Sequence, residues 1–120
     1  MMHNSIAVFA VKDVKASAGY YRDKLGFDLA FEYGTPAFYV GLCSGDVQLH
    51  LIEAGRATRQ PGHGAVSIFV DDVDALHADL QKRAARILKA PANQPYGLRD
   101  FDVADLDGNM LFFGMETAKS

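Results

Sequence analysis

The 120-residue sequence contains no tryptophan, one cysteine and four prolines. A lone Cys43 cannot form a disulfide within the chain, and no second cysteine stands at the spacing of a zinc site or a redox motif. We expect it to be a small apolar residue in a strand. The longest apolar runs, residues 6–11 and 110–115, are far shorter than the roughly 20 residues that a membrane-spanning helix needs. These shortages argue against a disulfide scaffold, cysteine chemistry and a membrane span.

Charge of one sign is not in excess either. The chain carries 12 Lys and Arg against 15 Asp and Glu, a formal net charge of -3, and the basic residues are scattered. A nucleic-acid partner is not expected, because such a partner requires a basic stripe or patch. The N-terminal residues show no basic region before their short apolar stretch and no small-residue cleavage site after it, which favours a cytoplasmic location.

The first half of the chain predicts a strand, a helix and three more strands. Residues 5–11 are β-branched and aromatic, as in a buried strand. Asp13 is a good N-cap for the helix that follows, and Gly26 is a good terminator. Between them runs one apolar stripe with helical spacing, formed by Val14, Ala18, Tyr21 and Leu25. The three strands that follow are expected at residues 29–33, 38–42 and 47–53.

The same order of elements is predicted again in the second half. Residues 65–70 are expected to form a strand and Asp72 to cap a helix. The helix has an apolar stripe of Val73, Leu76, His77, Leu80, Ala84 and Ile87. Further strands are expected at residues 87–90, 99–104 and 110–115, with a loop over 91–98 and a turn over 105–109.

The two halves also share letters at one structural joint. The sequence VKDV at 11–14 recurs as VDDV at 70–73, each time between a strand and the helix after it. A polar stretch without periodicity, residues 55–64, separates the halves. The sequence therefore predicts one α+β domain over 1–120, made of two tandem βαβββ modules at about 1–54 and 65–120.

These motifs, together with YYRDKLGF at 20–27 and DLDGN at 105–109, resemble the vicinal oxygen chelate superfamily, the group of glyoxalases, bleomycin-resistance proteins and extradiol dioxygenases. The resemblance covers nearly the whole chain. It implies paired βαβββ modules whose strands form a curved sheet around a cleft. It also implies a homodimer, since in many members a second subunit completes the cleft.

Catalytic members of this superfamily hold a divalent metal on side chains of the first and fourth strands of each module. The corresponding positions here are Ile6, His50, Ala65 and Phe112. Only His50 is a possible ligand, and one imidazole does not make a stable metal site. The resemblance thus implies a metal-free protein with no catalytic residues and no cofactor. The alternative is a glyoxalase-type lyase or isomerase, or a dioxygenase, in which His50 and a weaker candidate such as His63 or Glu53 bind a divalent metal.

The segment QPYGLRDF at 94–101 resembles the bleomycin-resistance branch most closely, with Tyr96 where tryptophan is usual. An aromatic side chain on a Pro-Gly loop can stack on a planar ligand, and Asp100 or Asp102 could attract a cation. The resemblance therefore implies a small-molecule binding protein that sequesters a planar, cationic ligand. It also implies a role in antibiotic resistance. Together with strand alternation within the implied fold, the resemblance implies these ligand-binding residues: Phe38, Gln48, His50, Ser67, Phe69, Tyr96, Asp102, Met110 and Phe112.

Overall fold

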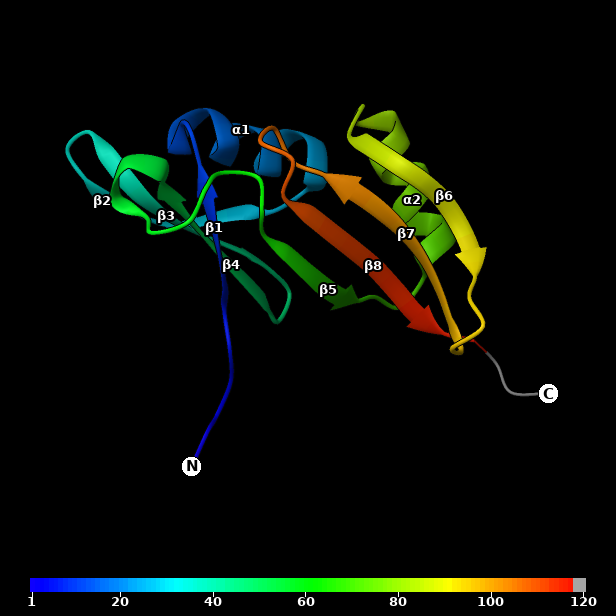
Figure 1. The fold of residues 1–120 in the computed structure, drawn as a ribbon. Helices are drawn as coiled ribbons and strands as arrows, with labels where there is room; N and C mark the ends of the chain where they lie inside the picture. Colours follow the sequence, from blue (N-terminus) through cyan, green and yellow to red (C-terminus); the bar gives the residue numbers. More distant parts are fainter. Residues whose placement is uncertain (118–120) are drawn as a thin grey trace.

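The computed structural model describes residues 1–117 and contains two mixed sheets of four strands each (Figure 1). The strand orders are β1-β4-β3-β2 and β5-β8-β7-β6, so the two sheets have the same topology. In each sheet the first and fourth strands of a module are parallel neighbours, and the other pairs are antiparallel. The predicted α+β fold of two βαβββ modules is confirmed. Residues 118–120, at the end of the second predicted module, lie outside the described part.

The first module follows the predicted order closely. Asp13 caps its helix by accepting hydrogen bonds from the backbone N–H groups of Lys15 and Ala16, and Gly26 ends it in the left-handed conformation. Cys43 lies in a strand, as expected. The elements are β1 (Ala7–Val11), α1 (Val14–Leu25), β2 (Asp28–Gly34), β3 (Ala37–Ser44) and β4 (Val47–Glu53).

The second module begins after a single turn of 3-10 helix, η1 (Ala54–Arg56), and an irregular segment. Its first strand and helix start where the sequence predicts, with Asp72 accepting a hydrogen bond from the backbone N–H of Ala75. The elements are β5 (Ala65–Phe69), α2 (Val73–Lys82), β6 (Arg86–Asn93), β7 (Leu98–Ala104) and β8 (Met110–Glu116).

The predicted extent of the second helix is wrong at its C-terminal end. The helix stops at Lys82, so Ala84 and Ile87 do not belong to its apolar stripe. Ala84 has a positive φ of 62°, which reverses the chain and lets the backbone N–H of Ala85 donate to the carbonyl of Leu80. Periodicity alone missed this end because the residue in the left-handed position is alanine rather than the usual glycine.

The strand after this helix is longer than predicted. β6 runs to Asn93 and includes Pro91, which was expected in a loop. A proline is tolerated because β6 is an edge strand, and the pairing with β7 is irregular between Lys89 and Ala92. This extension brings β6 residues alongside the β7 residues that form the candidate site.

One hydrophobic core joins the helices to the inner faces of both sheets. Alternation along β7 puts Phe101 and Val103 in this core with no exposed surface, whereas Asp100 and Asp102 point to the other face. The modules are also joined by polar contacts: the amide of Asn109 donates to the Ala10 carbonyl in β1, and its oxygen accepts from the backbone of Gly64. No helix within residues 1–117 is long and apolar enough to cross a membrane.

Candidate ligand-binding site

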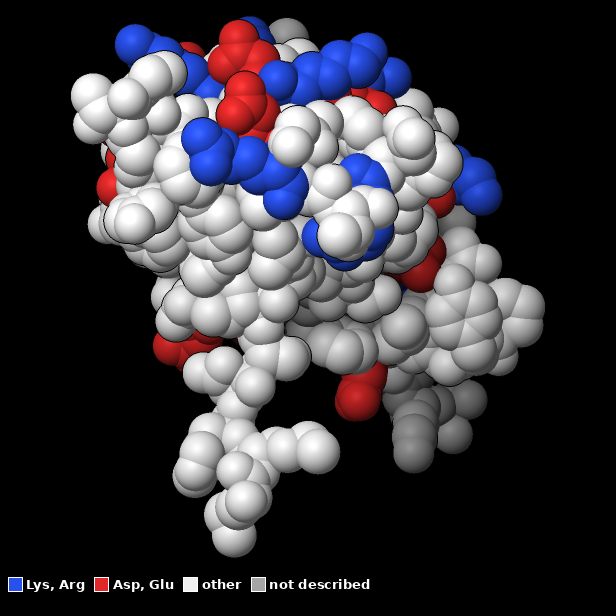
Figure 2. Space-filling view, turned by 60° about the vertical axis from the view of Figure 1, so that its left-hand side comes forward, with Lys and Arg blue, Asp and Glu red and all other residues white. Residues whose placement is uncertain are grey.

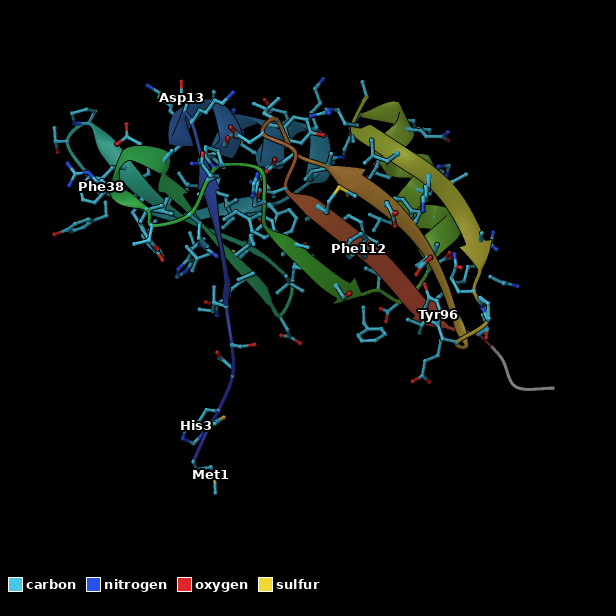
Figure 3. All side chains as sticks on the ribbon, in the orientation of Figure 1. Met1, His3, Asp13, Phe38, Tyr96 and Phe112 are labelled. Atoms are coloured by element: carbon cyan, nitrogen blue, oxygen red, sulfur yellow. The ribbon has the colours of Figure 1, made fainter. Side chains whose placement is uncertain are left out.

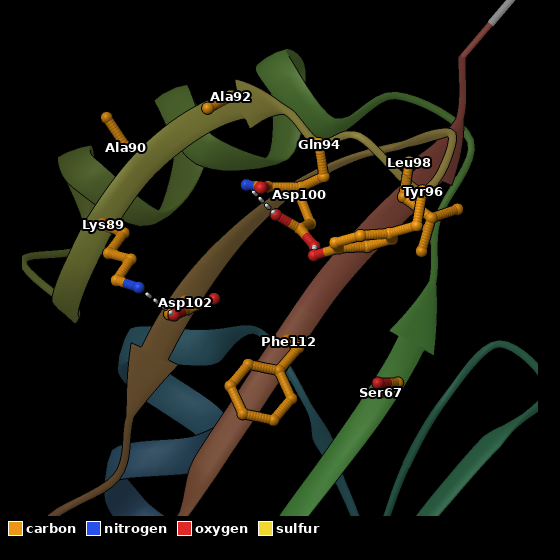
Figure 4. A pocket seen from close by; sticks show the side chains of 10 residues that line it. All are labelled: Ser67, Lys89, Ala90, Ala92, Gln94, Tyr96, Leu98, Asp100, Asp102 and Phe112. Atoms are coloured by element: carbon orange, nitrogen blue, oxygen red, sulfur yellow. Dashed lines mark hydrogen bonds and ion pairs between the residues drawn. The ribbon is translucent and has the colours of Figure 1, made fainter.

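The open face of the second sheet contains a pocket of about 360 Å³. Pairing across β6, β7, β8 and β5 places four side chains in one line: Lys89 opposite Asp102, Asp102 opposite Phe112, and Phe112 opposite Ser67 (Figure 4). We call these four residues the mixed row. All four line the pocket. The row therefore combines a cation, a carboxylate, an aromatic ring and a hydroxyl on one surface.

The next line of residues along the strands explains why the surface is hollow. Here Ala92 faces Asp100, and Asp100 faces Gly114, whose other neighbour is Phe69. Alanine and glycine fill little space beside Asp100, and the pocket extends over Ala92 and Asp100 as well as the first line of residues. Strand alternation accordingly brings both aspartates to the same side, which leaves Asp100 and Asp102 lining one pocket.

Tyr96 forms the wall of the pocket at the turn between β6 and β7. The residue is mostly exposed, at 67%, and its hydroxyl donates a 2.9 Å hydrogen bond to Oδ2 of Asp100. This hydrogen bond raises the pKa of Tyr96, because ionisation would place a second negative charge beside the carboxylate. Oδ1 of Asp100 accepts a 3.0 Å hydrogen bond from the side-chain amide of Gln94. The hydroxyl end of Tyr96 is thus held by a hydrogen bond while the face of its ring stays accessible (Figure 4).

Asp102 has a different environment. Its side chain is only 18% exposed, and the Lys89 ammonium nitrogen lies 3.9 Å from Oδ2. Burial raises the pKa of Asp102, and the neighbouring Asp100 carboxylate raises it further, whereas Lys89 acts in the opposite direction. Lys89 itself is 77% exposed.

Four of the predicted ligand-binding residues come together in this pocket, namely Ser67, Tyr96, Asp102 and Phe112. Two more, Gln48 and Phe69, lie in an adjoining open hollow that also includes Ser67. Phe69 is 68% exposed, a high value for a phenylalanine. These six residues therefore line two adjoining hollows of the open surface. Their role in binding stays a prediction.

The other three predicted residues lie elsewhere. The Phe38 ring contacts the Arg56 guanidinium, whose carbon lies 3.7 Å from the ring centroid, and it sits far from Tyr96 in Figure 3. Met110 is half-buried between Ala65 and Ala104 and lines none of the pockets described for residues 1–117. His50 belongs to the first sheet, so the pocket does not include it.

The first sheet carries an equivalent line of residues with different chemistry. Val8 faces His50, His50 faces Gly41, and Gly41 faces Phe31. A Cβ atom at Gly41 would collide with the Phe31 ring, so glycine lets that ring lie across the sheet against the imidazole. The face of the molecule seen in Figure 2 is largely uncharged below a charged upper edge. The first sheet thus presents a line that contains two aromatic side chains, and the second sheet presents the mixed row.

The metal-ligand positions implied by the resemblance do not fit a divalent ion. His50 and Phe112 occupy equivalent places, because His50 pairs with Val8 and Phe112 with Ser67, but phenylalanine offers no donor. Nδ1 of His50 is hydrogen-bonded to the Tyr39 hydroxyl at 2.9 Å. Within residues 1–117, no three His, Cys, Asp or Glu side chains converge as a metal site requires. His63 is exposed in the segment between the modules.

Sequence reasoning missed several residues of this surface. Asp100 was expected only to attract a cation, and no pattern indicated Lys89 and Gln94 in the pocket. Phe31 and Tyr39, which stack on the first sheet, were also not predicted. The alternation of Leu29, Phe31 and Tyr33 in one strand was an available signal for an aromatic face. No local pattern marks Lys89, because its partner is set by pairing with another strand.

Comparison with known proteins agrees with this fold. Residues 4–113 match the model of the Glyoxalase/Bleomycin resistance protein/Dioxygenase superfamily. The chain belongs to that superfamily. Curated relatives named bleomycin resistance protein, from Geobacillus stearothermophilus and Staphylococcus aureus, are 31% identical, and the alignments cover 93% of this chain and 96% of each relative.

Solved structures show the same architecture. A bleomycin-binding protein from Streptomyces verticillus, in complex with copper(II)-bleomycin, is 27% identical and has a TM-score of 0.78, with 100% of this chain and 98% of that chain covered. TioX from Micromonospora sp. ML1 is 21% identical with a TM-score of 0.82, over 97% of this chain and all of that one. At that identity, the second likeness concerns the fold alone.

Proposed function

We propose that this protein binds and sequesters a planar, positively charged small molecule of the bleomycin type, without a metal of its own. The observation that carries the proposal is the convergence of Tyr96 and Phe112 with Asp100 and Asp102 in one pocket. Aromatic faces stack on planar rings, and carboxylates in a partly desolvated pocket attract a cation. Bleomycins match this chemistry, because they combine planar heteroaromatic rings with a positively charged terminal group.

The relatives support the same ligand class. Proteins named for bleomycin resistance are similar over almost the whole chain, and the Streptomyces verticillus relative was solved with copper(II)-bleomycin. Sequestration requires affinity and no bond-making, which suits a pocket in which the metal-ligand position is occupied by the apolar Phe112. The proposal also includes a homodimer in which a second chain covers the open sheet surfaces.

Isothermal titration calorimetry with copper(II)-bleomycin tests the proposal. We expect binding by the wild-type chain and an affinity at least about fivefold lower for Tyr96→Ala, since loss of an aromatic stacking face costs on the order of 1 kcal/mol or more. Leu106→Ala is the matched control, because Leu106 is exposed on the turn between β7 and β8 and lines none of the described pockets. Equal affinities for Tyr96→Ala and the wild type would contradict the proposed pocket.

Native mass spectrometry of the purified protein tests the remaining parts. We expect the mass of a dimer without a bound divalent ion. A stoichiometric metal that is lost in His50→Ala would instead favour the glyoxalase-type alternative.

A further inference from the structure

The two aspartates of the pocket differ in how their carboxylates are occupied. Both oxygens of Asp100 accept hydrogen bonds, Oδ1 from Gln94 and Oδ2 from Tyr96. A ligand that used Asp100 for its charge would have to displace one of these donors. Asp100 is therefore best placed to hold the Tyr96 ring in position, as a positioning residue.

Asp102 is held much more loosely. Among residues 1–117, the ion-pair partner of its carboxylate is Lys89, at 3.9 Å, which is longer than a hydrogen bond. Asp102 is mostly buried and Lys89 mostly exposed, so the lysine side chain is open to solvent and the carboxylate is largely shielded from it. Across the sheet, the neighbour of Asp102 on the other side is Phe112. A planar cation stacked on Phe112 would bring its charge to Asp102 from the side opposite Lys89, so that both cations face the same carboxylate.

We infer that Lys89 is a specificity-determining residue of this pocket: it neutralises Asp102 in the free protein and competes with the positive charge of the ligand for that carboxylate. The inference deepens the proposed function and rests on it for the class of ligand. Displacement of Lys89 costs little, because its long side chain is flexible and mostly exposed and its ammonium nitrogen lies 3.9 Å from the carboxylate, beyond hydrogen-bond distance. Neutral planar molecules do not compete for the carboxylate, so Lys89 lowers the affinity for cations alone and thereby sets how strongly the pocket prefers them.

The test uses benzamidinium, a small planar cation, as a probe in place of any natural ligand. Carboxyl 13C resonances of Asp100 and Asp102 are followed by NMR during titration with benzamidinium chloride. We expect the Asp102 resonance to move more than that of Asp100. We further expect Lys89→Met to bind the probe about 3–10-fold more tightly than the wild type, the effect of removing one partly exposed competing charge.

Lys15→Met is the matched control, because it removes the same charge from α1, remote from the pocket. Its affinity should stay within about twofold of the wild type at physiological salt, where distant exposed charges are screened. Lys89→Gln repeats the test with a polar side chain and should behave like Lys89→Met. Benzamide, the uncharged analogue of the probe, should show no gain in either Lys89 variant.

Three outcomes would overturn the inference: movement of Asp100 in place of Asp102, no greater gain in Lys89→Met than in Lys15→Met, or an equal gain for benzamide. The result is separable from the proposed function. Failure of copper(II)-bleomycin to bind the wild type, with the expected benzamidinium result, would refute only the proposed ligand. Binding of copper(II)-bleomycin without any effect of Lys89→Met on benzamidinium would refute only the role of Lys89.

Discussion

The Tyr21 hydroxyl donates a 2.8 Å hydrogen bond to Oδ2 of Asp105, and both residues are completely buried. Tyr21 belongs to the helix of the first module and Asp105 to the turn before the last strand of the second. The same carboxylate accepts from the backbone N–H groups of Asp107 and Asn109. Burial and the nearby carboxylate raise the pKa of Tyr21 well above its ordinary value, so its hydroxyl keeps the proton that it donates.

Removal of that hydroxyl should destabilise the whole domain. We expect Tyr21→Phe to lower the free energy of unfolding by about 1.5–3 kcal/mol, the usual contribution of a buried hydrogen bond to a charged acceptor. Chemical denaturation at pH 7 measures the change. Tyr33→Phe is the control, since the Tyr33 ring is 65% exposed, and it should change stability by less than about 0.5 kcal/mol. Equal stabilities for the two variants would show that the contact between the modules contributes little.

Asp102 should make stability depend on pH in a direction unusual for an aspartate. Because burial raises its pKa in the folded state, the folded chain binds the Asp102 proton more readily than the unfolded chain does. The stabilisation from this group is complete below its pKa in the unfolded state and is lost as pH rises through the raised pKa. We therefore expect Asp102→Asn to have a higher Tm than the wild type at pH 7, with a difference that shrinks toward acid pH.

Thermal unfolding of both proteins between pH 4 and pH 8 checks this expectation. Asp46→Asn, a change on the exposed turn between β3 and β4, should follow the wild type throughout. A Tm of Asp102→Asn below that of the wild type at pH 7 would mean that the attraction to Lys89 outweighs burial.

The end of the second helix offers a stabilising substitution. Ala84 has φ 62°, a conformation that costs an L-residue about 1–2 kcal/mol and glycine very little. Part of that gain is offset because glycine loses about 0.5–1 kcal/mol more conformational entropy than alanine on folding. We expect Ala84→Gly to stabilise the domain by up to about 1 kcal/mol, measured by urea denaturation. Gln81→Gly, one position inside the helix, should do the opposite.

Two glycines with positive φ should differ sharply in their tolerance of a methyl group. A Cβ atom at Gly62 (φ 85°) would collide with the backbone carbonyl of Asp107, whereas a Cβ at Gly45 (φ 56°) would meet nothing within 4 Å. Both alanine variants carry the conformational cost, but only Gly62→Ala must also move the turn over residues 105–109. We expect Gly62→Ala to be less stable than Gly45→Ala by at least about 1 kcal/mol. Similar melting temperatures would contradict the close approach.

The sequence by itself determined the modular fold. Helix starts at Asp13 and Asp72, the helix end at Gly26 and the alternating strands depend on contacts within a few residues, so local patterns reveal them. The family motifs also led to Tyr96, Phe112 and Asp102, which lie on one surface. Where the local signal is weak, as at Ala84, the element boundary was wrong.

Only the tertiary structure decided how these side chains are paired. Whether Asp100 and Asp102 share a surface follows from alternation once the strand is placed, but which carboxylate holds Tyr96 and which faces Lys89 depends on the register of β6 against β7. Register and the contact between Tyr21 and Asp105 join residues distant in the chain, and their energies depend on the packing of the whole domain. The sequence specifies these long-range contacts only through the complete fold, so no local motif predicts them.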